Sequence, residues 1–187
     1  MLRFAQTCDA VAATTKKTEK IRLVSGLLRT MAPRGRRPAE LLKALNQALV
    51  ERKVEARYVT LFVLLWNPAT RQMVMANAGA LPPMICRASE ILKMRIEGVP
   101  LGLLDAREYE EVTFEARAGD TVVLFSDGIT DHLNQAGDEF GRGRLAQVVR
   151  GNCGKSAAEV CGAIFVEMDK FSTTAFDDQT VFVVKVK

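Results

Sequence analysis

Two early segments of the chain carry hydrophobic residues at the spacing of an amphipathic α-helix. The first covers residues 18–31 and is closed by Pro33 and Gly35, residue types that end helices. Pro38 then begins the second, because proline is favoured in the first turn of a helix. The repeating apolar positions are Ile21, Val24, Leu27, Leu28 and Met31 in the first segment, and Leu41, Leu42, Leu45, Ala48 and Leu49 in the second. We therefore predict two helices, each with one apolar face.

The rest of the chain carries short apolar or alternating runs between turn residues, a pattern typical of antiparallel strands. The predicted strands are Tyr58–Trp66, Arg71–Ala76, Ile85-Cys86 with Ile91–Ile96, Glu108–Phe114, Val122–Phe125 and Val181–Val186. A third helix is predicted over Ser156–Phe171, with Val160, Ile164 and Met168 on its core face. This order of elements predicts an α+β layered domain.

Composition narrows the classes of function. The 187 residues are 48% hydrophobic and 26% charged, so a single domain covering residues 1–187 is expected, with one sizeable core. The net charge of +4 is mild, and its clusters at Lys16-Lys17 and Arg34–Arg37 lack interleaved aromatic residues, so no nucleic-acid surface is expected. No apolar run has the length of a membrane span or the form of a signal peptide. We expect a cytoplasmic protein that does not bind membranes.

Histidine and cysteine offer little for catalysis. The four cysteines form no CxxC pair and His132 is the one histidine of the sequence, so a zinc site is not expected. A Ser-His-Asp mechanism would need His132 itself as the base. His132 lies in a polar stretch, Asp131–Asn134, and a structural role is favoured over a catalytic one.

One segment places a carboxylate where a buried strand meets a turn. The apolar run Val122–Phe125 ends in Ser126-Asp127-Gly128, and the glycine allows a sharp turn and the close approach of a ligand. Mg²⁺ and Mn²⁺ take oxygen ligands that are held rigidly. Asp127 is therefore a candidate metal ligand, although an ordinary Asp-Gly turn explains the same residues.

A second acidic site precedes the last predicted strand. Asp177 and Asp178 lead into Val181–Val186, and the end of one antiparallel strand lies beside the start of its neighbour. We therefore predict that Asp177 and Asp178 meet Asp127 at one edge of a sheet. Such carboxylates repel one another unless a cation neutralises them or one is protonated. The alternative is a set of solvated turn aspartates.

Six short segments follow one another in a specific order, although each is a weak signal alone. They are Tyr58–Phe62, Ala76–Pro83, Pro100–Leu103, Gly119–Asp131, Glu139–Gly141 with Arg144-Leu145, and Phe176–Thr180. In this order and spacing they resemble the PPM-type metal-dependent protein serine/threonine phosphatases, in the bacterial SpoIIE/RsbU branch. The resemblance covers roughly residues 20–187.

This resemblance implies an α-β-β-α sandwich of two antiparallel sheets flanked by helices. It also implies two Mn²⁺ or Mg²⁺ ions at one edge of the sheets, and a metal-activated water that attacks phosphorus in line. Asp127 and Asp177 match metal-binding aspartates, Asp178 stands where the family has Asp or Asn, and Ser126 and Gly128 flank the site. The implied function is a phosphoserine/phosphothreonine protein phosphatase of the sigma-factor regulatory type, with a phosphoprotein substrate such as an anti-anti-sigma factor.

The N-terminus departs from the family pattern, because the family's first strands and their Gly-Asp-x-x-Asp motif are missing. Without gaps, Leu2–Ala5 matches a strand and Asp9 falls on a metal-binding aspartate, but Ala10–Thr14 replaces the glycines that should follow. Ala80 also stands where the family usually has histidine. Residues 1–19 are therefore expected to be a degenerate segment, and the metal site to be incomplete.

Three hypotheses remain open: an active phosphatase, a catalytically impaired phosphatase-like domain that binds a protein, and an interaction domain whose acidic turns are only structural. The motifs favour the first as the function of the family, and the lost ligands favour the second for this polypeptide. Missing strands would expose a sheet edge. We therefore also expect a homodimer or exchange of the N-terminal segment between copies.

Overall fold

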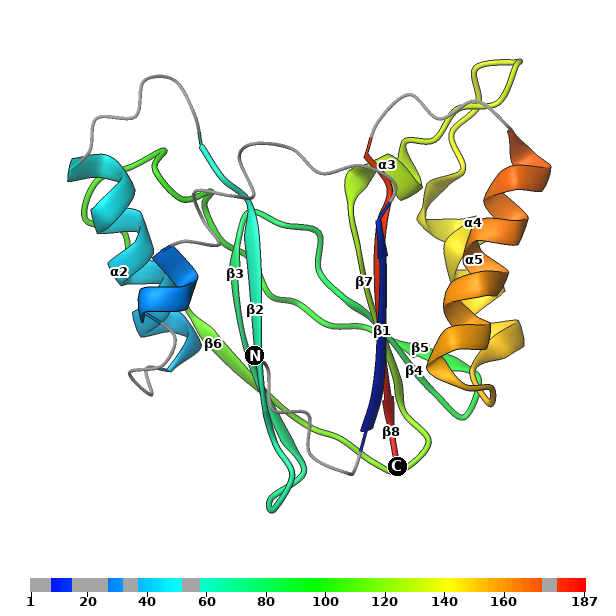
Figure 1. Cartoon of the computed structure of the whole chain (residues 1–187), viewed down its shortest axis with the longest axis horizontal. Helices are drawn as coiled ribbons and strands as arrows, with labels where there is room; N and C mark the ends of the chain where they lie inside the picture. The colour runs from blue at the N-terminus through cyan, green and yellow to red at the C-terminus, as the bar shows by residue number, and fades with distance from the viewer. Residues whose placement is uncertain (1–7, 15–26, 32–36, 52–57, 173–177) are drawn as a thin grey trace. The chain divides into compact units, whose positions relative to one another are not determined.

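The computed structural model describes residues 8–14 (backbone alone), 27–31, 37–51, 58–172 and 178–187. The chain divides into two compact units, each with one antiparallel sheet and helices (Figure 1). Unit 1 contains Met1–Lys17, Pro83–Met94 and Ala116–Lys187, and unit 2 contains Thr18–Pro82 and Arg95–Glu115. The predicted α+β class and its two antiparallel sheets are confirmed.

Unit 1 is built on a five-stranded sheet in the order β1-β8-β7-β4-β5. Its elements are β1 (Cys8–Thr14), β4 (Met84–Arg87), β5 (Glu90–Leu92), β7 (Thr121–Phe125), α3 (Asp127–Thr130), α4 (Gly141–Asn152), α5 (Ala157–Phe171) and β8 (Thr180–Val186). The central strand β7 is buried at every position except the half-buried Leu124. This burial on both faces is what a continuous apolar run predicts.

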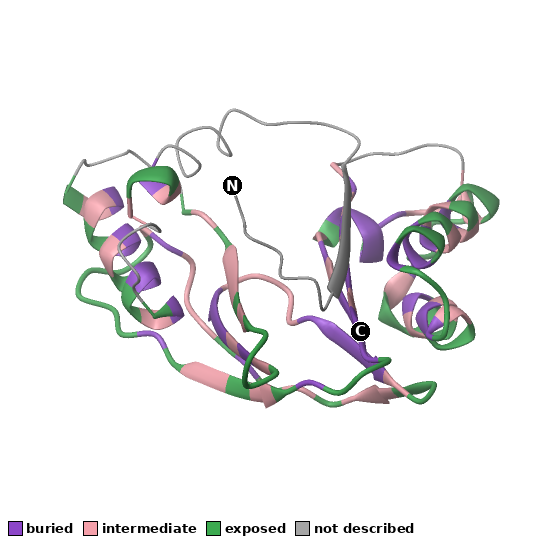
Figure 2. Cartoon of the chain, turned by 60° about the horizontal axis from the view of Figure 1, so that its bottom comes forward, coloured by how far each residue is buried: buried purple, intermediate pink, exposed green. Residues whose placement is uncertain are grey.

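The predicted C-terminal helix is present as α5. Its N-cap is Ser156, whose side chain accepts a hydrogen bond from the Glu159 amide while the Glu159 carboxylate accepts one from the Ser156 amide, which is a capping box. The predicted core residues Val160, Ile164 and Met168 are all buried. Figure 2 shows that the helices carry both buried and exposed residues. The helix packs on β1 and β8.

The sequence prediction missed α4. This helix starts with Gly141-Arg142-Gly143-Arg144, and its two buried residues are Leu145 and Val149. Glycine is a poor helix former, and the apolar residues of this segment lie only within Leu145–Val149, which is too short a stretch to show helical spacing. The helix is stabilised by tertiary packing, because α4 lies against α5.

The described part of the N-terminal segment, residues 8–14, is a β-strand. Strand β1 pairs with β8 in an antiparallel register that runs from Cys8 opposite Val186 to Thr14 opposite Thr180. The segment Leu2–Ala5, which was matched to a strand, lies outside the described residues. Part of the expected degenerate segment therefore completes the edge of the sheet in unit 1.

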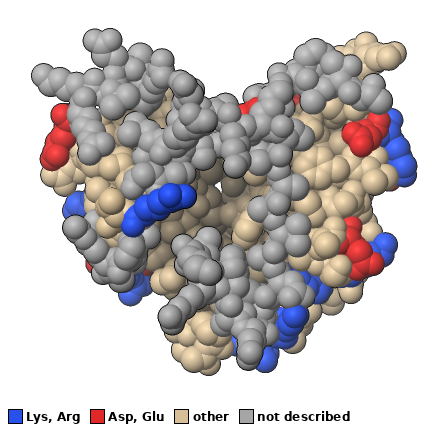
Figure 3. Space-filling model, in the orientation of Figure 1, with Lys and Arg blue, Asp and Glu red and all other residues tan. Residues whose placement is uncertain are grey.

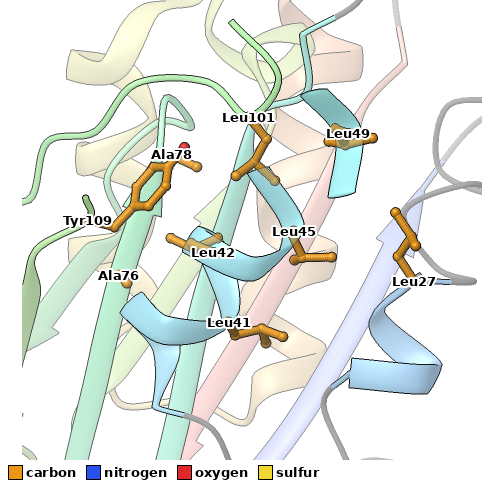
Figure 4. Close-up of a cluster of buried hydrophobic side chains, with 9 residues drawn as sticks. All are labelled: Leu27, Leu41, Leu42, Leu45, Leu49, Ala76, Ala78, Leu101 and Tyr109. Atoms are coloured by element: carbon orange, nitrogen blue, oxygen red, sulfur yellow. The ribbon is translucent and has the colours of Figure 1, made fainter. Parts of the chain in front are cut away.

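Unit 2 holds a three-stranded sheet in the order β2-β3-β6. Its elements are α2 (Pro38–Glu51), β2 (Leu61–Asn67), β3 (Gln72–Ala78) and β6 (Glu111–Glu115), and residues 27–31 are also helical. The second predicted helix, the predicted hairpin and the predicted edge strand are thus present. The buried residues of this unit cluster between α2 and its sheet (Figure 4): Leu27, Leu41, Leu42, Leu45, Leu49, Ala76, Ala78, Leu101 and Tyr109.

Two of the segments that resemble the phosphatase family, Ala76–Pro83 and Pro100–Leu103, pack closely against each other. The Asn77 side chain accepts from the Ala80 amide at 2.9 Å and donates to the Ala80 and Ile96 carbonyls at 3.0 Å. Gly98 lies so close that a Cβ atom there would stand 1.8 Å from the Asn77 carbonyl oxygen. Gly79 has φ +74°, and its Cβ would stand 2.5 Å from Pro100. A side chain at Gly98 would collide with the Asn77 backbone, and one at Gly79 would collide with the Pro100 ring and strain the positive φ.

The surface charges agree with the mild net charge. On the face shown in Figure 3, the Lys and Arg side chains of the described residues lie in separate groups. Of the two basic clusters in the sequence, only Arg37 is described, and it pairs with Glu111 at 2.6 Å. Within the described ranges, no helix has the length and apolar character needed to cross a membrane.

Candidate metal centre

The strand order of unit 1 brings two of the predicted acidic residues to one edge of the sheet. Strands β7 and β8 are antiparallel neighbours, with Phe125 opposite Val181. Asp127 follows the end of β7 by two residues, and Asp178 precedes the start of β8 by two residues. The two residues therefore lie at the same end of this strand pair. Asp177, the third acidic residue predicted here, lies outside the described residues.

Ser126 joins these two chain segments through three hydrogen bonds. Its backbone amide donates to the Thr180 carbonyl at 3.0 Å. Its hydroxyl donates to the Asp178 carbonyl at 3.0 Å and accepts from the Thr180 amide at 3.0 Å. The hydroxyl uses its donor and one acceptor position on a single neighbouring segment, so it sets how the Asp178 backbone lies beside the end of β7.

Asp127 is exposed and sits on a short, closed turn. Its backbone carbonyl accepts from the Asp131 amide at 2.8 Å, and its Oδ1 accepts from the Gly128 amide at 3.0 Å. Gly128 itself is buried. The turn therefore presents the Asp127 carboxylate to solvent while its backbone is held in place.

His132, expected in a polar stretch, is buried with only 5% of its surface exposed. Its Nε2 lies 3.0 Å from the Ser172 carbonyl oxygen, and its Nδ1 lies 3.2 Å from the amide nitrogen of Gln179. The ring also lies 6.3 Å from the Phe171 ring, centroid to centroid. Sequence reasoning did not single out Gln179, because a contact between residues 47 positions apart leaves no local pattern.

Asp9 does not lie at this edge. In the β1–β8 register it stands opposite Lys185, five positions from Thr180. Five residues of an extended strand span about 17 Å. The ungapped comparison put Asp9 on a metal-binding aspartate, but the antiparallel pairing carries it toward the other end of β8. The described backbone therefore does not bring Asp9 together with Asp127 and Asp178.

The donor chemistry of the edge fits a hard divalent cation. Asp127 and Asp178 supply carboxylate oxygens, which Mg²⁺ and Mn²⁺ prefer. Among the described residues, no group of three or more His, Cys, Asp or Glu side chains is arranged to hold a metal. Two carboxylates on a rigid edge can thus contribute to a metal site.

Comparisons with known proteins agree on the family. The family model described as Stage II sporulation protein E (SpoIIE) matches residues 21–187. The phosphoserine phosphatase RsbU of Bacillus subtilis is 28% identical over 157 residues, which is 82% of this chain and 46% of RsbU. The Stage II sporulation protein E of the same organism is 28% identical over 88 residues, or 47% of this chain and 11% of that protein.

Solved structures share the fold. The PP2C phosphatase domain of B. subtilis SpoIIE, with a fragment of its regulatory domain, matches with a TM-score of 0.78 and 20% identity, covering 100% of this chain and 57% of that chain. The SiaA-PP2C domain of Pseudomonas aeruginosa matches with a TM-score of 0.80 and 18% identity, covering 100% and 78%. The chain spans about half the length of the curated RsbU relative.

Proposed function

Because this chain belongs to the SpoIIE family, the SpoIIE/RsbU branch of the PPM-type phosphatases, we propose that it is a metal-dependent phosphatase acting on phosphoserine or phosphothreonine in proteins. The observation that carries the proposal is the edge at the end of β7. There the exposed Asp127 lies on the same strand end as Asp178, and Ser126 ties the two segments together.

In the proposed reaction, Asp127 and Asp178 bind Mn²⁺ or Mg²⁺, and Asp177 joins them by its match to the family motif. Divalent cations supply Lewis acidity and an activated water for attack on phosphorus. Ser126 and the turn after Asp127 hold the carboxylates in position, so little reorganisation is needed when a cation binds. No histidine base is required, which suits a chain whose one histidine is buried in hydrogen bonds.

The substrate proposed from the family is a phosphorylated regulatory protein, such as an anti-anti-sigma factor. The name of the RsbU relative, a phosphoserine phosphatase, supports the choice of phosphoserine. Self-association through a dimer or an exchanged N-terminal segment stays a prediction.

The experiment that tests the proposal is a Mn²⁺-dependent phosphatase assay on a phosphoserine peptide with the full chain. We expect Asp127→Asn to lower the rate at least 100-fold, roughly the upper end of the loss seen when a ligand loses only a supporting partner. The matched control is Asp105→Asn, the same change at another exposed aspartate, in unit 2. Its rate should equal that of the wild type. Equal rates for Asp127→Asn and the wild type would refute the proposal.

One observation favours a second candidate function, the catalytically impaired protein-binding module. Asp9 lies away from the edge that carries Asp127 and Asp178, so one of the expected ligands is displaced. A folded wild-type chain that neither hydrolyses the peptide nor binds Mn²⁺ in calorimetry would favour this candidate over the phosphatase.

A further inference from the structure

One imidazole ring binds both ends of the connection between α5 and β8. Ser172 is the first residue after α5, and its carbonyl oxygen lies 3.0 Å from Nε2 of His132. Gln179 directly precedes β8, and its amide nitrogen lies 3.2 Å from Nδ1 of the same ring. His132 itself belongs to a third segment, two residues after the end of α3. The ring is therefore a link between three parts of unit 1.

The chemistry of the partners fixes the roles of the two ring nitrogens. A backbone carbonyl only accepts hydrogen bonds, so Nε2 carries the proton and donates to Ser172. In the neutral ring Nδ1 then accepts, and the Gln179 amide supplies its N–H. One donor and one acceptor are needed at opposite sides of the ring, and imidazole provides both.

Burial makes these two hydrogen bonds hard to exchange for water. His132 is 5% exposed and Gln179 is 6% exposed. The ring is also enclosed by Phe171, which in turn packs edge-on against Phe140 with centroids 5.5 Å apart. A buried polar group that loses its partner is destabilising because water cannot replace the lost hydrogen bond, so the ring holds Ser172 and Gln179 together.

The segment before β8 is thus held from two sides. Ser126 binds the backbone of Asp178 and Thr180, and His132 binds the side chain of Gln179, the residue between them. The neighbouring Asp178 is only half-buried. Because Gln179 is anchored inside unit 1, the position of Asp178 relative to Asp127 is set by contacts that involve neither carboxylate.

We propose that His132 and Gln179 are positioning residues for the metal-binding edge, acting by holding the segment that carries Asp178 in place. This inference rests on the proposed metal-dependent function for its consequence, but its structural part stands without a metal. Partners that orient ligands in this way raise metal affinity by about 10–100-fold.

The test compares three variants of the full chain. His132→Phe keeps an aromatic ring beside Phe171 but removes both hydrogen bonds, and His132→Gln restores one donor and one acceptor. Thr121→Val is the control: Thr121 is fully buried, and its hydroxyl donates to the Cys153 carbonyl at 3.0 Å from the opposite end of β7. All three lose or rebuild buried hydrogen bonds in unit 1. Only the His132 variants alter the proposed edge.

The first readout needs no metal and is amide hydrogen exchange. The Thr180 amide, which donates to Ser126, should exchange at least about 10-fold faster in His132→Phe than in the wild type and in Thr121→Val, with partial recovery in His132→Gln. Amides of β8 further along, such as Val183, should change less. If Thr180 exchange is the same in His132→Phe and the wild type, the positioning role is wrong.

The second readout is the Mn²⁺ dissociation constant by calorimetry, together with kcat at increasing Mn²⁺. We expect binding about 10-fold weaker in His132→Phe, unchanged in Thr121→Val, and kcat that recovers toward the wild type as Mn²⁺ saturates. Unchanged affinity alongside faster exchange would overturn the metal-positioning role. A wild type that binds no Mn²⁺ would refute the proposed function, and the exchange result would then decide the structural part alone.

Gln179→Met offers a milder variant should His132→Phe fail to fold. It keeps the approximate length of the side chain and removes the hydrogen bond to Nδ1 of His132. Gln179→Met should weaken Mn²⁺ binding and speed Thr180 exchange less than His132→Phe, because the hydrogen bond from Nε2 to Ser172 remains. Unchanged Mn²⁺ affinity and unchanged Thr180 exchange in Gln179→Met would contradict the link.

Discussion

The two ends of the β7–β8 strand pair both carry an aspartate, but the two carboxylates have opposite surroundings. At the start of β7, Asp120 is fully buried and receives two hydrogen bonds from the Arg87 guanidinium, at 2.8 and 2.7 Å, and one from the Arg117 amide at 2.8 Å. At the end of β7, Asp127 is exposed.

The surrounding polar groups follow the same division. Near Asp120, the Lys185 ammonium donates to the Gly119 carbonyl at 2.7 Å, the Thr121 hydroxyl at 3.0 Å and the Cys153 carbonyl. Near Asp127, the side chains of Ser126, Gln179 and His132 hold the backbone through hydrogen bonds. At the Asp120 end, which we call the closed end, the carboxylate is buried and paired with Arg87. At the Asp127 end, which we call the open end, hydrogen bonds hold the backbone and the carboxylate is exposed. Burial and pairing thus separate a structural acid from a candidate ligand.

The largest loss of stability should come from removing the buried carboxylate of Asp120 at the closed end. Asp120→Ala leaves the Arg87 guanidinium, 24% exposed at its side chain, without its carboxylate, and removing one partner of a buried pair costs about 3–5 kcal/mol. Urea unfolding should show this loss. Asp127→Ala, at the open end, should change the metal-free unfolding free energy by less than about 0.5 kcal/mol.

The double variant Arg87→Met/Asp120→Leu sharpens that prediction. Replacing both partners by apolar side chains is often neutral, so it should recover most of the stability that Asp120→Ala loses. A double variant as unstable as the single one would mean that the cost comes from the turn and not from the unpaired charge.

A smaller effect should distinguish the half-buried hydroxyl of Ser126, after the end of β7, from the buried hydroxyl of Thr121 at its start. Ser126→Ala and Thr121→Val each remove a hydroxyl that both donates and accepts, so each should cost about 1–3 kcal/mol in urea unfolding. Only Ser126→Ala should also weaken Mn²⁺ binding, because only Ser126 contacts the Asp178 backbone. Equal Mn²⁺ affinities in the two variants would show that Ser126 does not support metal binding more than Thr121 does.

The smallest effect concerns the start of α5, which follows Cys153 at the closed end. Hydrogen bonds from Ser156 lower the pKa of Glu159 below its ordinary value of 4.5. Because the folded pKa is depressed, the contribution of Glu159 to stability is present above about pH 4.5 and is lost as the pH falls through the folded value. The protection factor of the Glu159 amide, which corrects for the intrinsic pH dependence of exchange, should therefore fall in acid, while that of Thr180 stays the same. In Glu159→Gln, which keeps an acceptor oxygen but no charge, this pH dependence should disappear.

Local chemistry explains which parts of the fold the sequence predicted. The apolar run that becomes β7, the Pro38 start of α2 and the apolar face of α5 with Val160, Ile164 and Met168 are short-range patterns, and each is present. Helix α4 was missed because its start is polar and rich in glycine, and its stability depends on packing against α5. The position of Asp9 also depends on tertiary structure, because an ungapped match carries no information about which residue of β8 Asp9 faces.

For the candidate site, the sequence by itself determined the residue types and their local setting: an aspartate and a glycine at the end of a buried strand, and two aspartates before another. Only the tertiary structure decided which of them meet. The order β1-β8-β7 places Asp127 and Asp178 at one end and turns Asp9 toward the other. It also brings His132 to Gln179 across 47 residues. The physical reason is that strand pairing and burial act between segments distant in sequence, where no local pattern of residues records the partner.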